Sequence, residues 1–196
     1  MLDIVNLHPP PVLKELEDEA RVIHFTMGSD YQTGALLRVL AASKPGGTLL
    51  ELGTGVGFSA AWMLDGMDAR ARLVTVDSNA PHVDIARRFL GHDSRITFTQ
   101  MDGVTFLNSM LEQGSQFDLL FADMPPGKFL RLDEAVRLLK PGGFYVIDDL
   151  LFLTSWEESH VTRVYRLVAY LESREDLKIL KLNWSTGLLV AVKIAI

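Results

Sequence analysis

Residues 48–59 read Thr48-Leu49-Leu50-Glu51-Leu52-Gly53-Thr54-Gly55-Val56-Gly57-Phe58-Ser59. This stretch predicts a short apolar strand, a glycine-rich turn and the start of a helix. Glycine has no Cβ and tolerates a positive φ, so alternate glycines let the backbone turn sharply while a ligand lies against it. The N–H groups at the start of the helix would face that ligand. The turn alone fits any nucleotide-like cofactor, because many α/β proteins use one to pack a helix on a strand.

The composition predicts one globular domain without disulfides. The chain has 196 residues and is 48% hydrophobic, which suits one full core and is too short for two comfortable domains. No run of about 18 apolar residues occurs, so we expect no membrane span. The first residues lack the basic-then-apolar pattern of a signal peptide. The absence of cysteine excludes disulfides, thiolate metal sites and cysteine nucleophiles, and we expect a cytoplasmic protein.

The net charge bears on the kind of partner. Lys and Arg number 19 against 25 Asp and Glu, which leaves a net charge of −6. A surface of this sign disfavours a broad contact with nucleic acid phosphates. We therefore expect that a nucleic acid is not the partner.

Strands and helices alternate along the chain. Apolar and β-branched runs predict strands at 48–52, 72–77, 96–99, 117–123, 144–149, 177–182 and 188–194. Apolar residues at helical spacing predict helices at 9–25, 31–42, 59–64, 130–139 and 156–173, with two more after Asn79 and Gly103. Either Ser78 or Asn79 can cap the first of these two. The last two strands are close enough to form an antiparallel hairpin.

This alternation predicts the α/β class. We expect an open, doubly wound, mostly parallel seven-stranded sheet with a C-terminal antiparallel hairpin. Residues 1–196 would form a single domain, and residues 1–44 would supply N-terminal helices that cover the site. In sheets of this kind, ligands bind at the carboxyl edge of the strands.

Acidic residues mark that edge. One acid or a pair of acids falls at or just after the end of each of five successive strands: Glu51, Asp77, Asp102, Asp123 and Asp148-Asp149. Taken singly, each acid could be a helix N-cap or part of a solvated turn. Five consecutive strands that end in this way favour a shared site.

The acids divide into two groups by the chemistry that they suit. Asp77 lies at the end of the second strand, where a carboxylate binds ribose hydroxyls and repels a 2′-phosphate. Asp102 could accept a hydrogen bond from an adenine amino group. Asp123, Asp148 and Asp149 would repel one another unless a cation or protons offset their charge. Such hard oxygen ligands suit Mg²⁺ or Ca²⁺, and Mg²⁺ in particular.

With these motifs the sequence resembles the class I S-adenosylmethionine-dependent methyltransferases, and more narrowly the cation-dependent O-methyltransferases of the catechol and caffeoyl-CoA type. The resemblance runs from Met27-Gly28 to the C-terminus and implies a Rossmann-like methyltransferase fold. It implies that Glu51 and Ser59 contact the methionine end of the cofactor. The cofactor-binding residues that we expect are Met27, Glu51, Gly53, Thr54, Gly55, Gly57, Ser59, Asp77, Ser78, Asp102, Gly103 and Asp123.

The resemblance also implies a metal site and a catalytic base. Phe121-Ala122-Asp123 and Ile147-Asp148-Asp149-Leu150 match the two metal-ligand segments, with Asp149 where the family usually has asparagine. Asp123, Asp148 and Asp149 are therefore the predicted Mg²⁺ ligands. The family lysine that deprotonates or orients the acceptor hydroxyl is replaced by Pro126. Lys128 is the nearest candidate for that role beside Asp123; the alternative is a solvated lysine that opens the following helix.

The function that we expect is metal-assisted methyl transfer from S-adenosylmethionine to a hydroxyl of a small, aromatic, catechol-like acceptor. Trp156 could wall the acceptor pocket, although core packing is the commoner role of tryptophan. A possible homodimer follows from the resemblance alone. Three alternatives remain open: methylation of a hydroxylated tRNA base, an NAD-dependent dehydrogenase, and a catalytically idle cofactor-binding module. The last is considered because Pro126 replaces the family lysine.

Overall fold

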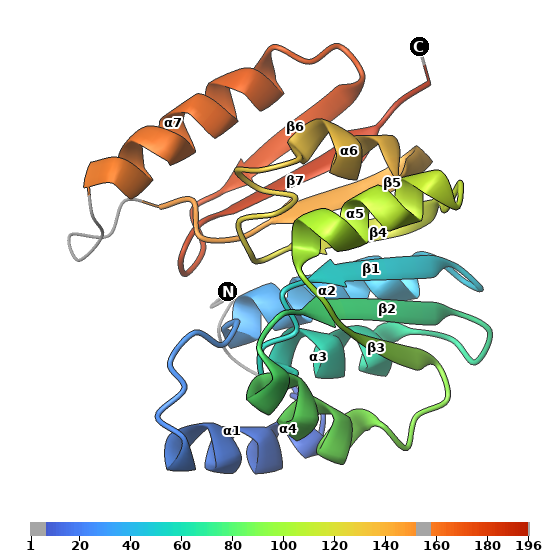
Figure 1. Cartoon of the computed structure of the whole chain (residues 1–196), viewed down its shortest axis with the longest axis vertical. Helices are drawn as coiled ribbons and strands as arrows, with labels where there is room; N and C mark the ends of the chain where they lie inside the picture. Colours follow the sequence, from blue (N-terminus) through green and yellow to red (C-terminus); the bar gives the residue numbers. More distant parts are fainter. Residues whose placement is uncertain (1–6, 152–157, 196) are drawn as a thin grey trace.

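The computed structural model describes residues 7–151 and 158–195. A seven-stranded sheet lies between two layers of helices (Figure 1). The strand order is β3-β2-β1-β4-β5-β7-β6. The strands are β1 (Thr48–Leu52), β2 (Arg72–Asp77), β3 (Ile96–Gln100), β4 (Phe117–Ala122), β5 (Leu139–Ile147), β6 (Leu177–Leu182) and β7 (Leu188–Lys193). The helices are α1 (Val12–Val22), α2 (Tyr31–Ala42), α3 (Phe58–Gly66), α4 (Ala80–Leu90), α5 (Gly103–Glu112), α6 (Leu132–Arg137) and α7 (Glu158–Glu172).

Strands β1 to β5 pair in parallel, and β7 pairs antiparallel with both β5 and β6. The predicted doubly wound sheet with its closing hairpin is confirmed. The strand order reverses between the neighbouring strands β1 and β4. From β1 the sheet continues through β2 to β3, and from β4 it continues in the other direction through β5. That reversal opens a crevice at the carboxyl edge, where the glycine turn lies.

The two faces of the sheet carry separate cores. Side chains alternate along a strand, so Leu119 and Phe121 face one core while Leu120 and Ala122 face the other. The first core contains buried residues of α1, α2, α3 and α4, and the second contains those of α5, α6 and α7. Helix α1 contacts α3 and α4. Both faces of the central strands are therefore covered, which explains why these strands are apolar throughout.

Several element boundaries differ from the predictions. Helix α6 ends at Arg137, and β5 begins at Leu139, so the predicted helix at 130–139 is wrong at both ends. The Lys-Pro-Gly-Gly segment at 140–143 belongs to β5, because Leu139 already pairs with Phe117 of β4. The register then shifts before Leu119, which accommodates the glycines. The first helix is also shorter than predicted, and it begins after Pro11.

The helix starts follow their capping residues. Asn79 caps α4, since its side chain accepts a hydrogen bond from the His82 N–H at 3.2 Å. The predicted start of the last helix at Trp156, and with it the proposed pocket wall, lies outside the described residues. No described helix is long and apolar enough to cross a membrane.

Candidate active site

The glycine turn holds the carboxyl ends of β1 and β4 close together. Gly53 has φ 107°, and a Cβ at this position would lie 2.9 Å from the carbonyl oxygen of Asp123. Gly57, at the start of α3, serves a different purpose. Its Cβ would lie 3.0 Å from a methyl carbon of Leu90 and 3.1 Å from Cβ of Ala86, both on α4. The turn thus combines a close backbone approach with tight helix packing.

A cavity of about 310 Å³ lies along this turn. Cavities of this size hold small ligands and cofactors. Eight of the predicted cofactor residues line it: Met27, Gly53, Thr54, Gly55, Ser59, Asp77, Ser78 and Asp123. Glu51, Gly57, Asp102 and Gly103 lie outside this lining. The structure therefore brings together most of the predicted set and places the remaining four behind or beside it.

Asp77 is fixed at the end of β2 by two backbone donors. The Gly55 N–H donates to Oδ2 and the Asn79 N–H donates to Oδ1, each at 2.9 Å. The carboxylate therefore ties the glycine turn to the loop that opens α4. Each oxygen keeps a further lone pair for a ligand in the cavity.

Glu51 is completely buried behind the turn. Its two carboxylate oxygens accept hydrogen bonds from Ser59 Oγ and Thr75 Oγ1, both at 2.5 Å. Burial raises the pKa of Glu51 to about 7, and these two hydrogen bonds act in the opposite direction. Ser59 lines the cavity, so Glu51 orients a residue of the cavity wall from behind.

The raised pKa of Glu51 predicts how stability changes with pH. In the unfolded state the carboxyl of Glu51 has an ordinary pKa of about 4.5, whereas in the folded state it keeps its proton up to a pH of about 7. Stability from this group is therefore full below about 4.5 and is lost as the pH rises to 7. The loss is about 3 kcal/mol, since one pKa unit is about 1.4 kcal/mol. We expect Glu51→Gln to remove this pH dependence, measured by urea unfolding of both proteins at several pH values. Parallel curves for the two proteins would contradict the burial effect.

Asp102 and Gly103 have clear structural roles. Asp102 caps α5 by accepting hydrogen bonds from the Thr105 N–H at 2.9 Å and from Thr105 Oγ1 at 3.1 Å. The Thr105 N–H is the main cause of a lowered pKa at Asp102. Gly103 packs against the loop after β4, and a Cβ there would lie 2.8 Å from Cβ of Pro126. A contact of either residue with adenine stays a prediction.

Asp123, Asp148, Asp149 and Lys128 form an acidic cluster with a buried ammonium at the ends of β4 and β5. Asp148 Oδ1 accepts hydrogen bonds from Thr186 Oγ1 and from the Asp149 N–H, both at 2.7 Å. Burial raises the pKa of Asp148 to about 6. Burial and the Asp148 carboxylate raise the pKa of Asp123 well above its usual range, and Lys128 acts against this. Three acids are thus held beside one cation.

Lys128 reaches the cluster from a tight loop. The N–H groups of Lys128 and Phe129 donate to the Pro125 carbonyl at 3.1 and 2.8 Å. The Lys128 side chain is 4% exposed, and its Nζ lies 2.8 Å from the Asp148 carbonyl oxygen and 3.3 Å from Asp149 Oδ2. The alternative of a solvated lysine that opens the next helix is wrong, because Lys128 is buried and α6 begins at Leu132.

The contacts of this cluster bear on the predicted metal. Within residues 7–151 and 158–195, no group of three or more His, Cys, Asp or Glu side chains could hold a metal ion. The Lys128 ammonium already engages Asp149 and the Asp148 carbonyl. Asp123, Asp148 and Asp149 therefore do not fit Mg²⁺ as a joint ligand set.

Several residues that line the cavity were not predicted from the sequence. Ser29 lines the cavity, and its buried Oγ has no hydrogen-bond partner among the described residues. Phe25 and His82 also line it, with ring centroids 4.9 Å apart and planes at 75°. Phe25 and Ser29 come from the segment between α1 and α2, which carries no strand-end signal. The only clue was the expectation that the N-terminal helices cover the site.

The family follows from this fold and from a direct match. The glycine turn, the fixed Asp77 and the closing hairpin define a nucleotide-type α/β site of the kind that methyltransferases use. The model of the O-methyltransferase family matches residues 5–194, and the chain belongs to that family. The resemblance seen in the sequence motifs is thereby confirmed.

Individual relatives are more distant. A catechol O-methyltransferase of Niastella koreensis is 28% identical over 123 residues, covering 60% of this chain and 56% of that protein. The chain spans about half the length of the curated relatives that it matches.

Solved structures extend the likeness over nearly the whole chain. The O-methyltransferase from Bacillus cereus in complex with SAH (S-adenosylhomocysteine) has a TM-score of 0.84 at 19% identity, covering 96% of this chain and 93% of that one. The O-methyltransferase TomG of Streptomyces achromogenes, in complex with SAM, has a TM-score of 0.85 at 20% identity, with 97% and 93% covered. At these identities the likeness shows a shared fold.

Proposed function

We propose that this protein is an S-adenosylmethionine-dependent O-methyltransferase that acts on a hydroxyl of a small acceptor. The observation that carries the proposal is the cavity at the glycine turn, with the fixed Asp77 carboxylate in its wall. Membership of the O-methyltransferase family supports the reaction. The SAH and SAM complexes of the similar structures support the choice of methyl donor.

The residues of the cavity suit this donor. The free lone pairs of Asp77 can accept the ribose hydroxyls, and its negative charge disfavours a 2′-phosphate. The buried Ser29 Oγ has no partner among the described residues, and the donor's polar groups would satisfy it. Thr54 and Ser59 supply further hydroxyls from the turn side. Helices α1 and α2 would cover the bound donor as part of one domain.

The chemistry of methyl transfer requires little beyond alignment. Bound S-adenosylmethionine supplies an activated methyl group on a sulfonium. The chain must hold the acceptor oxygen in line with that methyl carbon. Asp123, which lines the cavity, accepts the hydroxyl proton in this proposal, and the ammonium of Lys128, which acts electrostatically on Asp123, stabilises the resulting oxyanion. The acceptor leaves as a methyl ether.

Binding of the spent donor tests the first half of the proposal. We expect SAH to raise the melting temperature of the protein and NAD to leave it unchanged. Asp77→Ala should weaken SAH binding about tenfold or more, because a buried ligand hydroxyl loses a charged hydrogen-bond partner. Asp84→Ala, on the exposed side of α4, is the matched control and should bind SAH as the unaltered protein does. Stabilisation by NAD instead of SAH would support a dehydrogenase and overturn the proposal.

The Mg²⁺ site expected from the family resemblance stays a prediction. If Mg²⁺ assists the reaction, a chelator should abolish methyl transfer and added Mg²⁺ should restore it. The measurement is turnover with EDTA, followed by titration with Mg²⁺, at saturating donor. Turnover that survives chelation contradicts the metal prediction and leaves Lys128 as the cation of the site.

The resemblance also leads us to propose a homodimer located in the cytoplasm. Light scattering coupled to size exclusion, at several protein concentrations, tests the oligomeric state. A monomer across that range would contradict the dimer without affecting the proposed reaction.

A further inference from the structure

A chain of hydrogen-bonded hydroxyls connects the buried Glu51 carboxyl group to the wall of the cavity at the glycine turn. Ser59 Oγ and Thr75 Oγ1 each lie 2.5 Å from one Glu51 oxygen. Thr75 Oγ1 in turn lies 2.6 Å from Thr54 Oγ1. Ser59 and Thr54 line the cavity, whereas Glu51 and Thr75 are completely buried behind it. Glu51 therefore has one route to the cavity through Ser59 and another through Thr75 and Thr54.

The ionised form of Glu51 fixes the direction of every hydrogen bond in this chain. A carboxylate can only accept, so Ser59 and Thr75 must both donate to it. The single hydroxyl proton of Thr75 is then used, so Thr54 must donate to Thr75. The protons of Ser59 and Thr54 thus point away from the cavity. Toward a ligand these two oxygens offer only lone pairs, which suit a cation.

The protonated form of Glu51 reverses part of the chain. Its carboxyl proton is donated either to Ser59 or to Thr75. In the first case Ser59 is free to turn its own proton toward the cavity. In the second case Thr75 donates to Thr54, and Thr54 turns its proton toward the cavity. Either way the wall presents a hydrogen-bond donor, which disfavours a cationic ligand.

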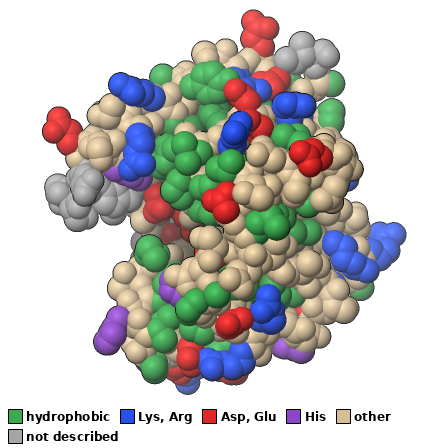
Figure 2. All heavy atoms as spheres, viewed as in Figure 1, with side chains coloured by type: hydrophobic (Ala, Val, Ile, Leu, Met, Phe, Trp, Pro, Cys, Tyr) green, Lys and Arg blue, Asp and Glu red, His purple; other side chains and the backbone are tan. Residues whose placement is uncertain are grey.

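Both forms of Glu51 are populated near neutral pH. Burial raises the pKa of Glu51 to about 7, and the Asp77 carboxylate adds to this increase. The other titratable residues that line the cavity, within the described part of the chain, are Asp123 after β4 and His82 on α4. Figure 2 shows Asp and Glu side chains inside the recess that divides this face of the molecule. Such a recess attracts a cation.

We propose that Glu51 is a positioning residue whose loss of a proton turns the Ser59 and Thr54 hydroxyls into acceptors for a cationic group of the methyl donor. The donor carries two such groups, the ammonium of its methionine end and the sulfonium. Binding of the cation and release of the Glu51 proton to solvent favour each other, because such coupling is reciprocal. This inference rests on the proposed function for the identity of the donor, although it needs no turnover.

The test counts the protons that are released on binding. S-adenosylmethionine, SAH and the uncharged 5′-methylthioadenosine are titrated by calorimetry at a pH of about 6.5, in buffers of different ionisation enthalpy. We expect S-adenosylmethionine to release about half a proton and 5′-methylthioadenosine none, as a decrease of about one unit in the pKa of Glu51 requires. Equal release by SAH assigns the effect to the ammonium, and release by S-adenosylmethionine alone assigns it to the sulfonium. The affinity for S-adenosylmethionine should rise about tenfold between a pH of about 5 and about 8.

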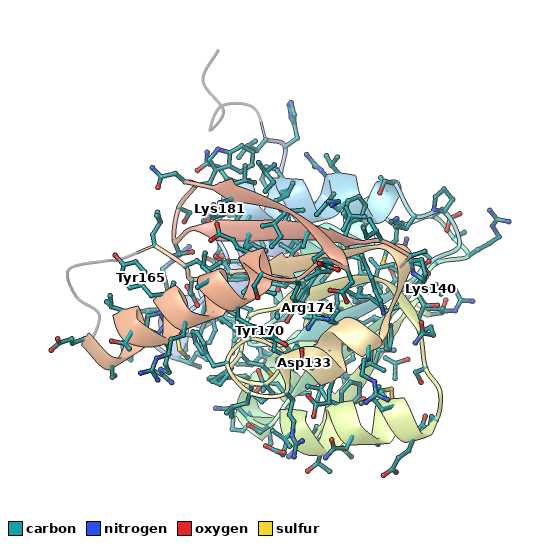
Figure 3. The ribbon with its side chains drawn as sticks, turned by 90° about the horizontal axis from the view of Figure 1, so that it is seen from above. Asp133, Lys140, Tyr165, Tyr170, Arg174 and Lys181 are labelled. Carbon is teal, nitrogen blue, oxygen red and sulfur yellow. The ribbon has the colours of Figure 1, made fainter. Side chains whose placement is uncertain are left out.

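Glu51→Gln imitates the protonated form, because its amide also donates to one of the hydroxyls. This variant should release no proton and should bind S-adenosylmethionine at every pH as weakly as the unaltered protein does at a pH of about 5. Asp133→Asn is the matched control. Asp133 also accepts a hydrogen bond from a hydroxyl, that of Tyr170 at 2.7 Å, but it is exposed on α6 beside Arg174 (Figure 3). The control should release the proton as the unaltered protein does.

Three outcomes overturn the inference: no proton released with S-adenosylmethionine, equal release with 5′-methylthioadenosine, or a release that persists in Glu51→Gln. A persistent release that is lost in His82→Gln or Asp123→Asn would show that one of these residues titrates instead. If Glu51→Gln does not fold, the comparison of the three ligands in the unaltered protein still decides. Binding of S-adenosylmethionine without proton release overturns only this inference, whereas no binding at all overturns the proposed function with it.

Discussion

Gly53→Ala is expected to weaken SAH binding more than tenfold and to destabilise the protein by about 2–4 kcal/mol. The backbone at Gly53 has φ 107°, which L-residues rarely adopt, and the added Cβ would meet the Asp123 carbonyl oxygen at 2.9 Å. Neither atom can move alone, since the Asp123 N–H is bonded to the Leu52 carbonyl at 2.8 Å. The ends of β1 and β4 must separate, and this distorts the cavity wall. Calorimetry with SAH and urea unfolding measure the two effects.

Gly114→Ala is the matched control for that substitution. Gly114 has φ 66°, and a Cβ there would meet nothing within 4 Å. Only the backbone strain remains, which costs about 1 kcal/mol and leaves SAH binding intact. Equal losses for the two variants would show that strain alone matters and that the close approach to Asp123 does not.

Lys128→Met is expected to lower kcat about 100-fold or more while SAH binds as before. The methionine keeps the length and burial of the side chain and removes the charge beside Asp148 and Asp149. The acceptor oxyanion then develops next to three acids without a cation. The loss should appear in kcat, with the KM for S-adenosylmethionine unchanged, because Lys128 does not line the donor cavity. Steady-state kinetics with a dihydroxylated aromatic acceptor measure it.

Lys140→Met removes an equivalent charge elsewhere. The Lys140 ammonium pairs with Asp118 at 2.7 Å, near the starts of β4 and β5 and so at the edge of the sheet opposite the candidate site. The Lys140 side chain is 43% exposed. Exposed ion pairs contribute at most about 1 kcal/mol to stability, so the Lys140→Met protein should stay folded. Because Lys140 lies away from the candidate site, its turnover should be unaffected. Normal turnover of Lys128→Met, in a variant that still gains stability from SAH, would remove Lys128 from the mechanism.

The architecture of the sheet could be predicted from the sequence because several repeated patterns indicate it. Apolar runs on β1 and β4 and the short hairpin connection each point to the same architecture. The boundary between α6 and β5 could not be predicted, because Lys-Pro-Gly-Gly at 140–143 ends helices in most settings. Here the pairing of Leu139 with Phe117 extends the strand through the glycines. Long-range pairing of this kind leaves no local trace in a sequence.

Some residues of the candidate site could also be predicted from the sequence, and others could not. Asp77 and Gly53 were predictable because their roles depend on the backbone at a strand end, which the local sequence encodes. Lys128 was a candidate only because it is the lysine nearest to Pro126, which replaces the family lysine. Its burial depends on a loop that folds back onto the end of β5. Ser29 and His82 could not be found, since they meet the cavity through packing of α1 and α4.

The separate cores on the two faces of the sheet have a consequence for divergence. The cavity at the glycine turn is lined by the loops after β1, β2 and β4, by the segment between α1 and α2, and by α3 and α4, whereas a second cavity, of about 460 Å³, is lined by the loop before α6, by α6 and by α7. The buried side chains of the two helical layers belong to separate cores on opposite faces of the sheet. Helix α7 can therefore change in sequence with little effect on the packing of the helices beside the glycine turn.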